Sequence, residues 1–278
     1  MSGRRRGTAR KLVMGEAEDV RGAAEALGRG CAVAHGFGNS YALTARADRE
    51  TVERVNLMKG RPATRPGSVT TVRARVRSVF DWPRLPPALP RQQVQDLVEE
   101  LFGIGPFGFR GPAAAHVPPH LTTVLDGVPT VRLIGPGYRC PSNAFLAEAL
   151  EDTGGGFLSV ASVDTARQAA GTDRAPAHWR ADGVAADFGH DPGVRILAHA
   201  DEAAARRRHP YHATTPVTVL SFHHTTGYGR SGLPALTLER HGSLSADYTR
   251  AVAANHGFAL VIAPRAARRL TARSYPEG

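Results

Sequence analysis

Segments typical of helices and segments typical of strands alternate along most of this chain, and this alternation constrains its fold more than any other feature. Apolar residues recur at helical spacing in residues 16–28, 48–59, 92–102, 143–151 and 245–255. Short apolar or alternating runs predict strands at residues 31–35, 68–76, 128–134, 157–163, 194–198, 216–222, 234–239 and 258–263. Interleaved elements of both kinds predict an α/β protein, with helices packed on a sheet.

No clear linker divides the chain, so we expect a single domain over residues 15–264. The arginine-rich start, residues 1–14, is expected to be a disordered basic arm, and residues 265–278 a C-terminal tail. The glycine-rich residues 36–41 and 103–111 are expected to connect elements. No apolar run reaches the ~18–20 residues that cross a bilayer, and no signal segment follows the basic start. We therefore expect a cytoplasmic protein without membrane contact.

The chain carries a formal net charge of +10 and has a pI of about 10.5, which favours an anionic partner such as a nucleotide or a nucleic acid. A coding bias toward arginine and alanine would also raise the charge, without any such partner. Aromatic residues make up only 6% of the chain, so stacking platforms for single-stranded nucleic acid are few. The composition therefore permits RNA binding but does not require it.

Lysine is rare in this chain, and one of its two lysines lies in the tetrapeptide Lys59-Gly60-Arg61-Pro62. This tetrapeptide follows a predicted helix, and its glycine ends that helix. Two cations of different shape at a helix C-terminus could hold a phosphate or a carboxylate. A plainer interpretation is that Lys59 only interacts with the helix dipole, and the tetrapeptide alone leaves both open.

Several segments resemble, in chain order, the YrdC-like family of threonylcarbamoyl-adenylate synthases. The Lys-x-Arg-Pro motif of that family is matched by residues 59–62. Its strand and its loop ending in Tyr-Gly-Leu are similar to residues 30–34 and 41–43. Its Arg-x-Pro and late Arg-x-Gly motifs resemble Arg139-Cys140-Pro141 and Arg240-His241-Gly242. Each motif alone is weak, and their common order carries the resemblance.

The resemblance spans roughly residues 15–262 and implies a YrdC-like α/β fold, a twisted mixed sheet with helices packed around a concave basic cavity. It implies an enzyme that combines ATP, bicarbonate and L-threonine into threonylcarbamoyl-AMP, a precursor of a modified adenosine in tRNA. Mg²⁺ is then expected with the triphosphate. RNA or a downstream carbamoyl-transfer protein would be further partners.

The resemblance also assigns roles to individual side chains. Lys59 and Arg61 are expected to be the catalytic cations that balance charge as pyrophosphate leaves. Nucleotide phosphates are expected to contact Arg139, Thr218 and Arg240. The rest of the pocket is expected to consist of Asn39, Ser40, Tyr41, Ser159 and Ser162. Positioning and charge balance suffice for this reaction, so no covalent nucleophile is expected.

Three of these residues also have plainer explanations. Arg139 could be a solvated loop arginine, Arg240 could pair with the neighbouring Glu239, and Thr218 could be a β-branched residue chosen for a strand. The run Arg206–Arg208 is expected in a solvated loop, with contact to phosphate or RNA as the alternative.

The pocket departs from the family pattern at two places. The family loop Pro-Thr-Asp-Thr-x-Tyr-Gly-Leu falls on residues 36–43, where both threonines are absent, and its Ser-Ala-Asn segment falls on residues 160–162. Phe37 and Val160 replace polar walls and should change which substrate fits. Three hypotheses follow: the threonine reaction, the same chemistry on another amine or amino acid in a specialised pathway, or a non-catalytic nucleotide- or RNA-binding module.

The remaining motifs predict no other site. His223 and His224 are adjacent after a strand, so their side chains are expected on opposite faces, and Pro210 between His209 and His212 argues against a helical pair. We therefore expect no metal site. The chain has no Gly-x-Ser-x-Gly elbow of a serine hydrolase and no Gly-x-x-x-x-Gly-Lys-[Ser/Thr] phosphate loop.

Overall fold

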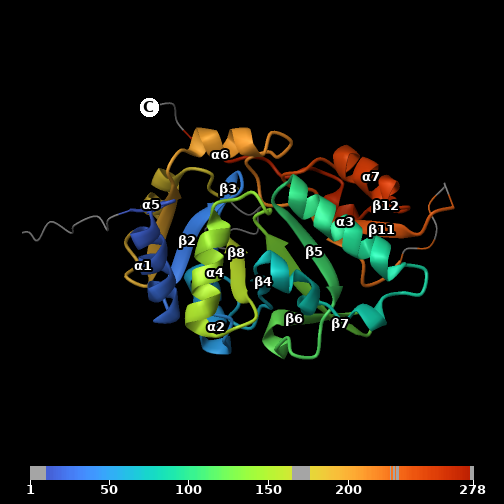
Figure 1. Ribbon diagram of the computed structural model, residues 1–278, viewed down its shortest axis with the longest axis horizontal. Coiled ribbons are helices and arrows are strands. Elements are labelled where there is room, and N and C mark those ends of the chain that lie inside the picture. The colour runs from blue at the N-terminus through green and yellow to red at the C-terminus, as the bar shows by residue number, and fades with distance from the viewer. Residues whose placement is uncertain (1–10, 165–175, 226, 228, 230–231, 276–278) are drawn as a thin grey trace, which may run out of the picture.

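The computed structural model describes residues 11–164, 176–225, 227, 229 and 232–275, and helices and strands interleave along it (Figure 1). The α-helices are α1 (Ala17–Gly28), α2 (Arg49–Met58), α3 (Arg91–Ile104), α4 (Ser142–Thr153), α5 (Ala181–Phe188), α6 (Glu202–Arg208) and α7 (Ala246–Asn255). The strands are β1 (Leu12–Met14), β2 (Ala32–Phe37), β3 (Ser40–Ala45), β4 (Ser68–Thr70), β5 (Phe107–Pro112), β6 (Thr122–Leu125), β7 (Val128–Gly135), β8 (Leu158–Ser162), β9 (Val194–His199), β10 (Val219–Ser221), β11 (Ala235–Arg240) and β12 (Ala259–Ile262).

The strands of this described region form one mixed sheet in the order β1-β9-β2-β3-β8-β4-β7-β5-β10-β11-β12, with β6 paired to β7. The sheet contains parallel pairs such as β2–β9 and β5–β10 as well as antiparallel pairs such as β2–β3 and β5–β7. Strands far apart in the sequence become neighbours, such as β2 with β9 and β5 with β10. The predicted α/β class, a twisted mixed sheet with packed helices, is confirmed.

Helices cover both faces of the sheet on its β1 side. Alternate residues of a strand face opposite sides, and β2 shows this directly. Val33 packs in a cluster with residues of α1 and α4, whereas Ala32 and Ala34 pack in a cluster with residues of α5. Helices α1 and α4 contact one another, and Figure 1 shows them in front of β2 and β8. Burial on both faces explains why every residue of β2 is buried.

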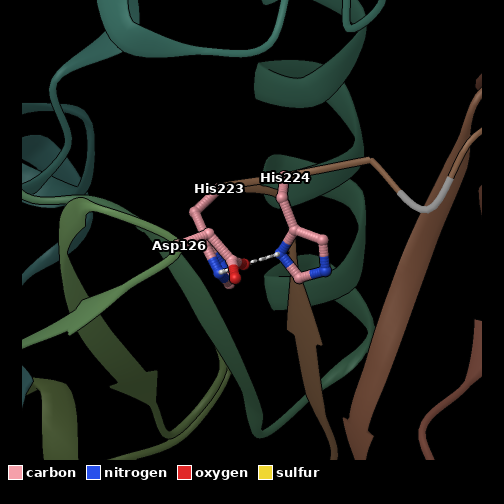
Figure 2. Close-up of side chains that lie close together, drawn as sticks. All are labelled: Asp126, His223 and His224. Atoms are coloured by element: carbon pink, nitrogen blue, oxygen red, sulfur yellow. Dashed lines mark hydrogen bonds and ion pairs between the residues drawn. The ribbon is translucent and has the colours of Figure 1, made fainter.

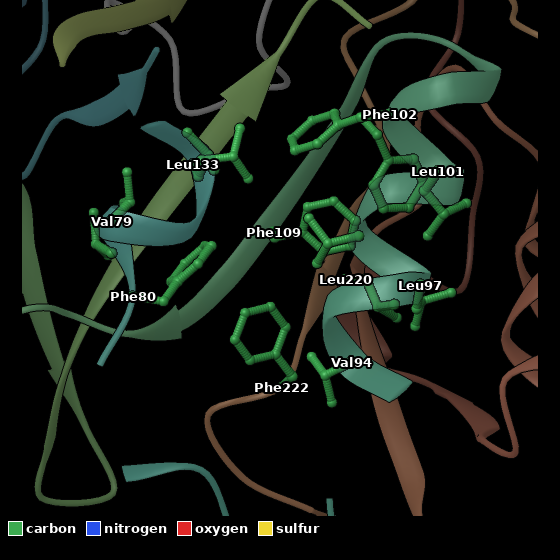
Figure 3. Packing of buried hydrophobic residues seen from close by; sticks show 14 of the residues in the cluster. Val79, Phe80, Val94, Leu97, Leu101, Phe102, Phe109, Leu133, Leu220 and Phe222 are labelled. Carbon is green, nitrogen blue, oxygen red and sulfur yellow. The ribbon is translucent and has the colours of Figure 1, made fainter. Parts of the chain in front are cut away.

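The largest core lies toward the β12 end of the sheet, between α3 and strands β5, β7 and β10 (Figure 3). Helix α3 directs Val94, Leu97 and Leu101 into it, as the helical spacing predicted. The rings of Phe102 and Phe109 meet edge to face, with centroids 5.1 Å apart. Edge-to-face packing of this kind adds to the burial of large apolar area.

Side chains cap the starts of two helices. The Asp48 side chain accepts a hydrogen bond from the Thr51 amide at the start of α2, and Ser245 accepts one from Tyr248 at the start of α7. Each cap satisfies an amide that has no partner inside its helix.

Two glycine-rich segments predicted as connections lie largely in strands. Residues 36–41 span the tip of the β2–β3 hairpin, whose two-residue turn contains Gly38 with φ +62°. Residues 103–111 contain most of β5, which is buried throughout. A Cβ on Gly108 would lie 2.6 Å from Ile134, and one on Gly111 would lie 2.1 Å from Phe222. These glycines therefore permit close packing against a central strand and are not turn residues.

Three further expectations need correction. The strand predicted for residues 68–76 ends at Thr70, and a 3₁₀ helix follows at Arg73–Val79, which buries Val76 and Val79 at a spacing of three. The predicted loop Arg206–Arg208 is the last turn of α6. Of the predicted arm, residues 1–10 lie outside the described residues, but β1 pairs with β9 and is therefore ordered.

The C-terminal tail contacts the rest of the protein. Trp179 donates a hydrogen bond to the carbonyl of Arg273, and His178 shares one with the Tyr275 hydroxyl. Among the residues described, no helix combines the length and the apolar character needed to cross a membrane.

Candidate functional site

Two adjoining hollows form one cleft above the middle of the sheet. Together with the solvent space that opens into them, they measure about 390 and 530 Å³. Both are lined by the same central group, Ser68, Val160, Ala161, Ser162 and Arg240. The cleft is therefore continuous across β8, and its two ends differ in chemistry.

One end of the cleft is apolar. Its walls include Phe37, Ile134, Val160 and Val217, which pack in one small hydrophobic cluster. Strand alternation positions them, since Phe37 ends β2 and Val160 lies in the middle of β8. This end suits an uncharged group more than a charged one.

The other end is basic. Four arginines from different elements line it: Arg61, Arg65, Arg132 and Arg240. Arg61 and Arg65 follow α2, Arg132 lies in β7, and Arg240 ends β11. The Nε of Arg240 donates to the Val217 carbonyl at 2.7 Å. No Asp or Glu lines either hollow, as far as the described residues go. The cationic lining favours an anion with several oxygens, such as a phosphate or carboxylate.

Arg132 is the most unusual of these cations. Burial, and then the charges of Arg110 and Arg240, lower its pKa to about 9. Within the described region its buried Nε has no hydrogen-bond partner. Glu239 is the carboxylate nearby, and it is engaged by Arg110 at 2.9 Å. A guanidinium holds its proton strongly, so an anion bound here would relieve an unfavourable accumulation of positive charge.

Lys59 and Arg61 converge on a carboxylate that the sequence analysis did not single out. Lys59 Nζ lies 2.5 Å from Asp164 Oδ1, and Arg61 donates to the same oxygen at 2.8 Å. Lys59 also donates to the Ser162 carbonyl, and the Ser162 hydroxyl donates to Asp164 Oδ2 at 2.8 Å. The side chain of Lys59 is completely buried. The motif therefore forms an ionic cluster at the edge of the cleft.

The ionic cluster keeps Asp164 charged. Burial alone would raise the pKa of Asp164, but Lys59 and Arg61 together outweigh it and hold the pKa below its usual range. Asp164 follows β8 by two residues, whereas Lys59 follows α2, so the pair joins these elements.

Several predicted pocket residues do line the cleft. Ser40 and Tyr41 line its apolar end, Ser159 lines its basic end, and Ser162 lines both. The Tyr41 hydroxyl, however, points away and donates to Glu202 at 2.9 Å. Burial, followed by the charge of Glu202, raises the pKa of Tyr41. Tyr41 therefore lines the cleft with its aromatic ring and not with its hydroxyl.

Asn39 and Thr218 make hydrogen bonds inside the protein, and neither lines the cleft. Asn39 donates to the carbonyls of His209 and His212, so it anchors that loop. The Thr218 hydroxyl donates to the Leu244 carbonyl at 2.6 Å and accepts from the amides of Gly242 and Leu244. The one donor and two acceptor positions of this hydroxyl are therefore all used inside the protein, and the phosphate contact expected for Thr218 finds no support in this arrangement.

Arg139 is exposed in the loop before α4 and lines neither hollow. Its charge acts instead on His209. Arg132, seven residues earlier, lines the basic end of the cleft. A charged residue within the apolar run of β7 was the available signal, since Val131 and Leu133 beside it are buried.

The sequence matches no model of a known protein family and no curated protein. Its fold, however, matches solved structures. A double variant of P. abyssi Sua5 aligns with a TM-score of 0.61 at 20% identity, covering 89% of this chain and 62% of that one. P. abyssi Sua5 complexed with L-threonine aligns with a TM-score of 0.57 at 19% identity, over 88% and 59%. E. coli YciO gives 0.50 at 15% identity, over 73% and 82%.

These similarities confirm the YrdC-like fold expected from the sequence, in a divergent chain. The chain spans about three fifths of the length of the Sua5 chains that it matches. At these identities the likeness establishes the fold, and the chemistry has to be argued from the cleft.

Proposed function

We propose that this protein makes an N-carbamoyl-amino-acid adenylate from ATP, bicarbonate and an amino acid, with threonine as the default substrate. The observation that carries the proposal is the cleft itself, which joins an arginine-lined end to an apolar end on a YrdC-like fold. A structural neighbour, P. abyssi Sua5, was solved in complex with L-threonine, which supports an amino-acid substrate.

The basic end fits the charged parts of such substrates. As pyrophosphate leaves, negative charge grows on oxygens between the α- and β-phosphates, and fixed cations stabilise it. Arg61, Arg65, Arg132 and Arg240 line this end. Asp164 fixes the Lys59 and Arg61 side chains. These two side chains would therefore need little reorganisation when substrate binds.

The reaction needs no protein nucleophile. An oxygen of the N-carboxylated amino acid attacks the α-phosphorus of ATP, and the bond to pyrophosphate breaks. Mg²⁺ would neutralise charge on the triphosphate. In the part of the chain that is described, no carboxylate lines the cleft, so the protein offers no set of ligands for that ion, and the phosphates themselves would have to carry it.

The apolar end favours a second candidate, the same chemistry on another amino acid. Phe37 and Val160 form walls of this end, and neither can bond to a substrate hydroxyl. A pocket of this kind discriminates weakly between a hydroxyl and a methyl group. We therefore expect activity with valine or other apolar amino acids to approach or exceed that with threonine.

The test is pyrophosphate release by the full chain with ATP, Mg²⁺ and each amino acid, with and without bicarbonate. Pyrophosphate release that requires both bicarbonate and an amino acid supports the proposal. The preferred amino acid then shows whether the substrate is threonine or another amino acid. If ATP binds but no amino acid or amine tested releases pyrophosphate, the proposal fails and a nucleotide-binding module without catalysis replaces it.

A further inference from the structure

A carboxylate and two histidines meet at a second place, and none of the three lines the cleft. Asp126 lies in the two-residue turn between β6 and β7, with φ 51° before Gly127. His223 and His224 follow β10 on the segment beyond Ser221. Figure 2 shows the Asp126 carboxylate reaching toward both imidazoles. Three ligand atoms from two separate segments therefore point to one spot.

The two histidines were expected to face opposite ways, and the structure corrects this. Strand β10 ends at Ser221, so the pleat does not continue to His223 and His224. Their ring centroids lie 4.2 Å apart, and His224 Nδ1 lies 2.8 Å from His223 Nε2. The bend after the strand brings two imidazole nitrogens together.

The spacing of the three ligand atoms suits a metal ion. An ion bound at about 2.1 Å in tetrahedral geometry holds its ligand atoms about 3.4 Å apart. The two nitrogens lie 2.8 Å apart, at hydrogen-bond distance, and Asp126 Oδ2 lies 3.8 Å from each of them. A bound ion would replace this hydrogen bond and move the partly exposed His224 ring away by about 0.6 Å. The Asp126 side chain is 72% exposed, so it can move the remaining distance at little cost.

The surroundings of His223 select the nitrogen that would bind. His223 Nδ1 lies 2.6 Å from the Ser221 hydroxyl, and its side chain is only 1% exposed. This hydrogen bond fixes the ring and leaves Nε2 directed at His224 and Asp126. Histidine ligands are commonly held in this way through their other nitrogen. One ligand atom of the group is therefore held in place by a buried, hydrogen-bonded ring, unlike in a chance contact of surface side chains.

We propose that Asp126, His223 and His224 form a binding site for one Zn²⁺ or a similar divalent transition-metal ion. Two imidazoles and one carboxylate suit zinc better than Mg²⁺, which prefers oxygen ligands. Three protein ligands leave a fourth position for water or another small ligand. Bound metal would tie the β6–β7 turn to the segment after β10, which stabilises the folded state.

The experiment uses the full chain without an affinity tag, stripped with a chelator. Titration with Zn²⁺ by calorimetry should show one ion per chain and raise the melting temperature. Co²⁺ should give the intense visible absorption of a four-coordinate site. Both readouts are independent of catalysis, so they test the metal site whether or not the proposed adenylate reaction occurs.

Variants assign the ion to these residues. His224→Ala and Asp126→Asn should remove the Co²⁺ absorption and the rise in melting temperature, and both side chains are exposed enough for the fold to survive. Ser221→Ala should weaken binding about 10–100-fold while one ion still binds. His190→Ala, a change at an exposed histidine, is the control and should bind like the wild type. Unchanged binding in His224→Ala and Asp126→Asn, or no stoichiometric binding by the wild type, overturns the proposal.

Discussion

Lys59 Nζ lies 2.5 Å from Asp164 Oδ1, and both side chains are almost completely buried. The lysine of the Lys-x-Arg-Pro motif is thus held by a carboxylate of the protein before any substrate arrives. Arg61 shares that carboxylate and lines the cleft. A buried ion pair of this kind contributes little net stability, but it fixes the position of its members.

Replacing Asp164 with asparagine should destabilise the fold by about 3–5 kcal/mol, because two buried cations lose a charged partner. Urea unfolding measures the change. Asp182→Asn is the matched control, since the Asp182 carboxylate is 74% exposed and pairs with Lys11. Its cost should stay below about 1 kcal/mol. Equal costs for the two variants would contradict the role given to Asp164.

Replacing Arg132 with methionine should weaken ATP binding about 10–100-fold, the loss expected for one hydrogen bond to a charged group. Methionine keeps much of the apolar length of the side chain, so folding should survive and stability should hold or rise. Calorimetric titration with ATP gives the affinity. Arg91→Met changes an exposed arginine at the start of α3 and should leave affinity unchanged. Wild-type affinity in Arg132→Met would exclude Arg132 from the site.

The variant Val160→Thr should shift substrate preference toward the amino acid threonine. The new side chain has nearly the shape of valine but adds a hydroxyl to the apolar end, which can bond to the substrate hydroxyl. We expect the ratio of kcat/KM for threonine over valine to rise about tenfold. Val124→Thr, on an exposed position of β6, is the control and should not change that ratio. An unchanged ratio in Val160→Thr would mean that the apolar end does not hold the amino-acid side chain.

The sequence predicted the elements well and the site only partly, for identifiable reasons. Lys59 and Arg61 were found because they are close in sequence, but Asp164 lies 105 residues from Lys59 and has no local signal. The Arg-x-Pro motif points to Arg139, whereas Arg132 lines the cleft, because motif spacing cannot show which arginine faces a cleft. Thr218 carried a plausible motif, yet its hydroxyl is used by the Leu244 backbone. Such assignments depend on tertiary contacts, which no local pattern encodes.

His35 should make the protein less stable in mild acid. It is buried in β2, and burial lowers its pKa from 6.5 to about 3. The folded state therefore binds fewer protons than the unfolded state between these values. Stability is complete above about pH 6.5 and falls as the pH drops toward 3, by up to about 1.4 kcal/mol per pH unit.

Unfolding free energies at about pH 7.5 and about pH 5.5 measure this dependence. His35 Nδ1 lies 3.1 Å from the Gly36 carbonyl and Nε2 lies 2.8 Å from the Thr44 hydroxyl. His35→Gln can donate and accept in the same place but does not titrate, so its stability should fall less with acid than that of the wild type. An equally steep fall would assign the effect to other histidines whose pKa values burial also lowers, among them His199, His209 and His212.

Two glycines of one predicted connection should respond oppositely to alanine. A Cβ on Gly111 would lie 2.1 Å from Cε2 of Phe222 and 2.8 Å from Phe80, within the main core. Gly111→Ala should therefore cost about 3 kcal/mol or more. Gly103 lies in α3 with nothing within 4 Å of its would-be Cβ. Gly103→Ala should stabilise by about 0.5–1 kcal/mol, because alanine loses less backbone entropy in a helix. Denaturant unfolding of both variants tests the pair, and a neutral Gly111→Ala would show that β5 does not pack as closely as described.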